Sequence, residues 1–110
     1  MHCLCGEQTS ELKVEGDIGA DPIWCSQCGA NCDLEEIPVS KELKRELREW
    51  ASMYGEWTNW DLDKLIPNGV EMENEHNIQG AKLTEKVHGV LKGRYEIVFV
   101  PSIMARSYCL

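Results

Sequence analysis

The sequence predicts a small α+β protein: an N-terminal module of short antiparallel strands joined to a two-helix unit with at least one further β-strand. Three observations predict this class. Short apolar–polar alternations flank close cysteine pairs in the first third of the chain, two long stretches carry apolar residues at helical spacing, and residues 95–100 are rich in β-branched and aromatic side chains. A chain of 110 residues forms one domain or two very small ones. We therefore expect a module at residues 1–38 and an α+β unit at residues 40–110 packed against it.

Two close cysteine pairs dominate the first module. Cys3 and Cys5 form one pair, Cys25 and Cys28 form the other, and a glycine follows each pair directly. A tetrahedral zinc ion, with sulfur at about 2.3 Å, needs ligands that are locally close in pairs, and both spacings allow this. The sequence therefore predicts a structural zinc site with these four cysteines as ligands.

The two Cys-Gly knuckles resemble those of the zinc ribbon and the related rubredoxin-type families, over about the first third of the chain. The resemblance implies that all four knuckle cysteines bind the metal. Those families usually separate both pairs by two residues, whereas a single residue separates Cys3 from Cys5. Cys32 or His2 could therefore replace Cys3, although a buried apolar role is favoured for Cys32, and iron could replace zinc in the same cage.

Three short strands are expected around this site. Residues 11–15 alternate polar and apolar side chains, Ile23 and Trp24 precede the second knuckle, and Leu34–Val39 follows it as the third strand. Trp24 with the second cysteine pair also has the look of a thioredoxin-type redox motif. The sequence that follows does not open a helix, so redox exchange is the weaker interpretation.

The first helix should begin after Ser40, which is a good N-cap, and run to about Tyr54. One of its faces is basic, and it is either solvated or a dock for the acidic front end of the chain. That face comprises Lys41, Lys44, Arg45 and Arg48. An irregular segment follows, in which Trp57 and Trp60 are expected to be buried but are also the candidate binding hot spots.

The second helix should run from Glu71 or Glu73 to Leu91 and be followed by the strand at 95–100. Gly80 on its inner face suggests close approach of another backbone. The expected buried face comprises Met72, His76, Gly80, Leu83, Val87 and Val90.

Two Glu-x-x-His pairs on this helix raise the question of a metalloenzyme. Glu73 with His76 and Glu85 with His88 have the spacing of di-iron carboxylate sites, but such sites combine pairs from different helices. We therefore expect His76 to be a core histidine bonded to the backbone and His88 to be a surface residue. No catalytic motif is present, so a non-enzymatic role is favoured.

Charge indicates the kind of partner. The formal net charge is −8 at pH 7, and residues 1–38 hold one lysine against eight carboxylates. Nucleic-acid-binding proteins cluster Lys and Arg, so this balance opposes such a role. We expect a protein-binding module with a basic protein partner; the alternatives are a small metal-dependent or thiol-redox enzyme and, less favoured, a nucleic-acid-binding ribbon. Because the sequence has no secretory signal or long apolar run, we expect it to be cytoplasmic.

Overall fold

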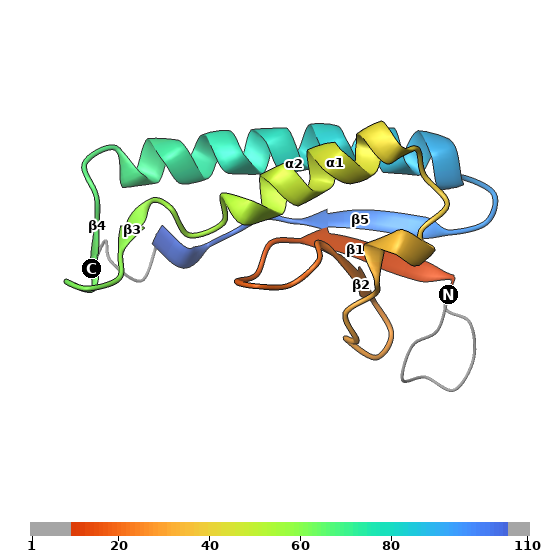
Figure 1. The fold of residues 1–110 in the computed structure, drawn as a ribbon, viewed down its shortest axis with the longest axis horizontal. Helices are drawn as coiled ribbons and strands as arrows, with labels where there is room; N and C mark the ends of the chain where they lie inside the picture. The colour runs from red at the N-terminus through yellow and green to blue at the C-terminus, as the bar shows by residue number, and fades with distance from the viewer. Residues whose placement is uncertain (1–9, 106–110) are drawn as a thin grey trace.

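The computed structural model describes residues 10–105 as two helices packed on a three-stranded sheet, with a small hairpin at one end (Figure 1). In chain order, the described elements are β1 (Glu11–Glu15), β2 (Ile23–Cys25), the 3-10 helix η1 (Leu34–Glu36), α1 (Lys41–Ser52), β3 (Thr58–Asn59), β4 (Lys64–Leu65), α2 (Gly69–Leu91) and β5 (Glu96–Val100). The predicted α+β class is confirmed. Neither helix in the described part of the chain is long and apolar enough to cross a membrane.

The three-stranded sheet has the order β2-β1-β5. β1 pairs antiparallel with β2, as expected, but it pairs parallel with β5, so that Leu12 lies opposite Ile97 and Val14 opposite Phe99. The central strand thus joins the two ends of the described chain in one sheet. That arrangement places a strand from the C-terminal part of the chain next to the cysteine-rich part.

The core lies between this sheet and the two helices. Leu12 and Val14 alternate with exposed or half-buried residues along β1, which gives the strand one buried face. The helices contribute residues three and four apart in sequence, as the periodicity predicts. The buried helical apolar residues are Leu43, Leu47 and Trp50 from α1 and Leu83, Val87 and Leu91 from α2.

The prediction of a strand at Leu34–Val39 is wrong, because this segment begins with the 3-10 turn η1. Two aspartates account for the difference. The Asp33 side chain accepts a hydrogen bond from the backbone N–H of Glu35 (2.9 Å), and Asp21 Oδ2 accepts one from the N–H of Leu34 (2.9 Å). These side chains satisfy donors that a strand would direct to a neighbouring strand, and so they favour the turn.

The helix boundaries follow local signals. Ser40 Oγ accepts a hydrogen bond from the N–H of Leu43 (3.0 Å), so the predicted N-cap of α1 is confirmed. α2 begins earlier than expected, at Gly69, because Asn68 adopts the left-handed conformation (φ 68°) and the turn leads directly into the helix. Near its other end, Val90 is 53% exposed and Leu91 is buried, so the expected inclusion of Val90 in the core face is wrong.

Gly80 has a tight environment, but its neighbours are aromatic rings and not another backbone. A Cβ at this position would lie 2.4 Å from Phe99 Cε1 and 2.7 Å from Trp50 Cζ2. The missing side chain lets α2 approach β5 and α1 at the same point. The expectation of a close contact at Gly80 is therefore correct, but the expectation that the contact is with another backbone is wrong.

The segment that the sequence suggested was irregular contains the hairpin β3–β4. Thr58 lies opposite Leu65 and Asn59 opposite Lys64, and Asn59 Oδ1 accepts a hydrogen bond from the N–H of Leu62 (3.1 Å). Trp57, just before the hairpin, is 1% exposed. Trp60, in the turn of the hairpin, is 53% exposed. Burial was therefore correctly expected for Trp57 only.

Candidate functional site

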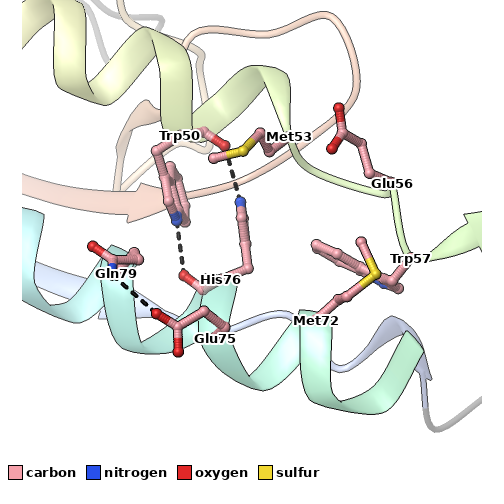
Figure 2. Close-up of a pocket in the computed structure, with 8 residues that line it drawn as sticks. All are labelled: Trp50, Met53, Glu56, Trp57, Met72, Glu75, His76 and Gln79. Carbon is pink, nitrogen blue, oxygen red and sulfur yellow. Dashed lines mark hydrogen bonds between the residues drawn. The ribbon is translucent and has the colours of Figure 1, made fainter. Parts of the chain in front are cut away.

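A pocket of about 220 Å³ opens between α1, α2 and the segment that leads into β3 (Figure 2). Its wall is mainly apolar and aromatic, with polar groups at the rim. The lining residues are Trp50, Met53, Glu56, Trp57, Met72, Glu75, His76 and Gln79.

Trp50 and His76 form the centre of the pocket wall. The indole Nε1–H of Trp50 donates to the carbonyl oxygen of His76 (2.8 Å), and His76 Nε2 is 3.0 Å from the carbonyl oxygen of Trp50. Figure 2 shows both bonds, and the rings stack with centroids 4.4 Å apart and an interplanar angle of 11°. A carbonyl only accepts, so Nε2 carries the proton in this contact. The expectation of a core histidine bonded to the backbone is confirmed.

Burial lowers the pKa of His76, because the charged imidazolium would be removed from water. The hydrogen bond to the Trp50 carbonyl and the charges of Glu73 and Glu56 act in the opposite direction, but they are smaller. The neutral form is therefore favoured, and it leaves Nδ1 as an acceptor. This ring serves the pocket as a fixed, uncharged wall.

Two buried polar atoms of the pocket residues have no hydrogen-bond partner in the described structure, His76 Nδ1 and Trp57 Nε1. The two rings are neighbours, with centroids 5.0 Å apart. An unsatisfied buried group costs about 1–3 kcal/mol, so such groups are rare in native proteins. Both occur beside the same pocket, which distinguishes it from the rest of the described core.

The rim of the pocket is acidic. Glu56 and Glu75 are exposed there, and Glu75 Oε1 accepts a hydrogen bond from Gln79 Nε2 (3.0 Å). No lysine or arginine is among the described residues that line the pocket. A wider groove continues from it along the two helices, where Lys86 pairs with Glu46 (2.9 Å). The pocket lining therefore holds only acidic charges, whereas the lining of the groove holds charges of both signs.

Glu73, which precedes His76 in one of the two Glu-x-x-His pairs, has a structural role. Glu73 is buried, and its Oε2 accepts hydrogen bonds from Ser102 Oγ (2.8 Å) and from the N–H of Ala105 (3.0 Å). Asn77, one turn later, exchanges two hydrogen bonds with the backbone of Ser102. Glu73 and Asn77 thus fasten the segment after β5 to α2. His88 is exposed, as expected.

Several pocket residues were not singled out from the sequence. Met53 and Glu56 follow the end of α1, and Glu75 and Gln79 lie on the face of α2 next to the apolar stripe. The available signal was the presence of Met53 and Glu56 between Trp50 and Trp57 in the sequence. It is a weak signal, because the pocket residues come together only when α1 packs against α2.

The predicted metal ligands are only partly described. Cys25 is buried at the end of β2, whereas Cys28 is exposed in the following turn, where Gly29 has the expected positive φ (78°). Cys3 and Cys5 lie outside the described residues, as does His2. Within residues 10–105, no three His, Cys, Asp or Glu side chains gather as a metal-binding group.

Cys32 is buried beside β2, in agreement with the apolar role favoured from the sequence. Its backbone N–H donates to the carbonyl oxygen of Ile23 (2.9 Å). The four-cysteine site therefore stays a prediction, with two members outside the described part of the chain.

Part of the acidic front end is neutralised by α1. Glu35 pairs with Arg48 (2.5 Å) and Lys44 (3.7 Å), while Arg45 pairs with Glu42 and Glu49 of its own helix. The hydrogen bond and charge of Arg48, followed by the charge of Lys44, lower the pKa of Glu35. The basic face of α1 is therefore both a solvated helical face and a dock for one acidic residue of the first module.

Fold and pocket together define a small α+β protein with an open apolar pocket between its two helices. Comparison with protein families gives a narrower assignment: the chain belongs to the family described as Serratia CdiI immunity protein-like, whose model matches residues 10–102. That range runs from the residue before β1 to beyond β5. No curated protein matches the chain.

The family assignment corrects the resemblance to zinc ribbon and rubredoxin-type families, which is wrong. The sheet gives the physical reason. β1 lies between β2 and β5, so the strands near the cysteines do not form a ribbon of their own. Knuckle-like cysteine spacing is a local pattern that unrelated folds can carry.

Proposed function

We propose that this protein is an immunity protein that binds a protein toxin and blocks its activity. The observation that carries the proposal is the family match over residues 10–102, which includes every described helix and strand. The proposal agrees with the protein-binding role favoured by the sequence. It also agrees with the pocket, since an open apolar pocket with an acidic rim is suited to a partner's side chains.

The toxin surface is proposed to be basic. The formal net charge of −8 produces a long-range attraction for a cationic surface, which increases the association rate. The same charge opposes binding to nucleic acid. Because exposed charges are screened by salt, association should slow as the ionic strength rises.

The test is co-expression. Candidate toxin domains from the source organism are expressed from an inducible promoter with and without this protein, and growth is followed. Rescue of growth by one toxin, together with a complex of the purified proteins in size-exclusion chromatography, is the expected result. Binding kinetics at 50 and 300 mM salt then test the charge argument.

Failure to rescue growth and failure to form a complex with every candidate would refute the proposed function. A complex whose association rate is independent of salt would retain the immunity role and refute the basic toxin surface. A catalytically inactive toxin variant gives the binding measurement without toxicity, so the two readouts are independent.

A further inference from the structure

We infer that the pocket between α1 and α2 receives an apolar side chain from a basic segment of the toxin, and that the exposed ring of Trp60 contacts the same segment. This inference rests on the proposed function and specifies its contact surface. The occupant is an apolar residue with a lysine or arginine close to it in sequence or in space.

The size and lining of the pocket favour a side chain over a small-molecule ligand. Its volume of about 220 Å³ is below the roughly 300–1,000 Å³ of small-molecule sites. Trp50 and His76 are held in place by their two reciprocal hydrogen bonds, whereas Met53 and Met72 at the entrance are flexible. A rigid aromatic wall with an adaptable entrance fits an inserted apolar side chain.

Charge decides which apolar segment fits. Glu56 and Glu75 stand at the rim, and no basic residue is among the described lining residues. A lysine or arginine beside the inserted side chain would meet these carboxylates, whereas an acidic segment would be repelled. A second copy of this protein would bring the same acidic rim to the contact, which disfavours self-association through this pocket.

Trp60 extends the surface beyond the pocket. Its ring packs over Gly55, where an added Cβ would lie 3.0 Å from Trp60 Cζ2. Gly55 directly precedes the pocket residue Glu56 in the chain, so Trp60 extends the surface on the Glu56 side of the pocket without lining it. The ring is 53% exposed, and Leu62 in the same turn is also exposed. An exposed tryptophan beside an apolar pocket has the composition of a binding hot spot.

The unsatisfied atoms of the pocket wall give a second indication. His76 Nδ1 can accept and Trp57 Nε1 can donate a hydrogen bond, and both are covered in this structure. Polar atoms without partners, next to an open pocket, indicate a wall that is not optimised for the unbound protein alone.

The experiment measures binding to the inactive form of the toxin that the wild-type protein neutralises. Three variants change the pocket lining or the adjoining Trp60 and are called the pocket variants: Trp60→Ala, Met53→Lys and the double charge reversal Glu56→Lys/Glu75→Lys. We expect Trp60→Ala and Met53→Lys each to raise the dissociation constant for the toxin at least tenfold. The charge reversal should lower the association rate at least tenfold at 50 mM salt, with a smaller difference at 500 mM.

Matched controls separate the pocket from general effects. Val98→Lys introduces the same charge at a 56% exposed position of β5, and Glu36→Lys/Glu96→Lys makes the same change in net charge at two exposed positions that do not line the pocket. The controls should retain binding within about threefold of the wild-type protein. Thermal unfolding of each variant confirms that it is folded.

The outcomes distinguish the two levels of the proposal. If the pocket variants bound the toxin as tightly as the wild-type protein does, the pocket inference would be refuted and the immunity role would remain. Equal losses in the charge-reversal variant and its control would also refute it, because net charge would then explain the effect. Absence of wild-type rescue and binding would overturn the proposed function and the inference with it.

Discussion

Gly80→Ala tests the packing of α2 against its neighbours. In an ordinary exposed helix interior, this change stabilises by about 1 kcal/mol, because alanine has the higher helix propensity. Here the new Cβ would lie 2.4 Å from Phe99 Cε1 and 2.7 Å from Trp50 Cζ2, closer than real Cβ contacts allow. The Trp50 ring cannot move without loss of its hydrogen bond and its stacking with His76.

The expected magnitude follows from two opposing effects. Overpacking of a well-packed core costs about 1–3 kcal/mol, and the propensity gain offsets about 1 kcal/mol of it. We therefore expect Gly80→Ala to reduce the free energy of unfolding by about 1 kcal/mol. Gly89→Ala is the matched control on the same helix, because a Cβ there meets nothing within 4 Å. It should be neutral or stabilise by up to about 1 kcal/mol.

Urea denaturation, followed by circular dichroism at 222 nm, gives both free energies, and the two variants should differ by about 1–3 kcal/mol. For a domain of this size, about 1 kcal/mol corresponds to a shift of about 4–8 °C in Tm. If Gly80→Ala were as stable as Gly89→Ala, the described contact of the two rings with α2 would be incorrect.

Two further predictions concern pH and metal. Burial lowers the pKa of His76, so its contribution to stability is complete above about pH 6.5 and is lost as the pH falls toward the lowered native pKa, with a slope of at most about 1.4 kcal/mol per pH unit. The difference in unfolding free energy between pH 7.5 and 5.5 should be smaller in His76→Phe; an unchanged difference would contradict this reasoning. The cysteine spacing predicts about one zinc per chain in protein purified under reducing conditions without chelator, and its loss in Cys28→Ser. Elemental analysis that finds no stoichiometric metal in the wild-type protein would reject the four-cysteine site.

Sequence patterns were sufficient for elements that local signals define. The alternation at residues 11–15, the Ser40 cap and the apolar run at 95–100 each correspond to an element of the structure. The failure at Leu34–Val39 has a local cause too, because the Asp33 and Asp21 side chains favour a turn in a segment that was expected to be a strand from its place after the second cysteine pair. Position relative to a cysteine pair is therefore a poor guide where aspartate can cap the backbone.

The pocket could not be predicted in the same way, because its parts are distant in sequence. His76 was correctly expected in the core, but its reciprocal bonds with Trp50 depend on how α1 and α2 are aligned. The parallel pairing of β5 with β1 is likewise a choice between distant strands that periodicity does not encode. The cysteine motif was misleading as a family signal for a different reason, since a short spacing pattern carries no information about the strands around it.

The parallel contact between β1 and β5 also has a consequence for synthesis in the cell. Glu11 lies opposite Glu96 and Glu15 opposite Val100, so β1 cannot pair with β5 until residues 96–100 have left the ribosome. A polypeptide that ends before β5 would expose one edge of β1 and the inner face of α2, and cellular proteases would have access to it. Incomplete copies would therefore be removed, and the supply of active protein would follow the number of finished chains.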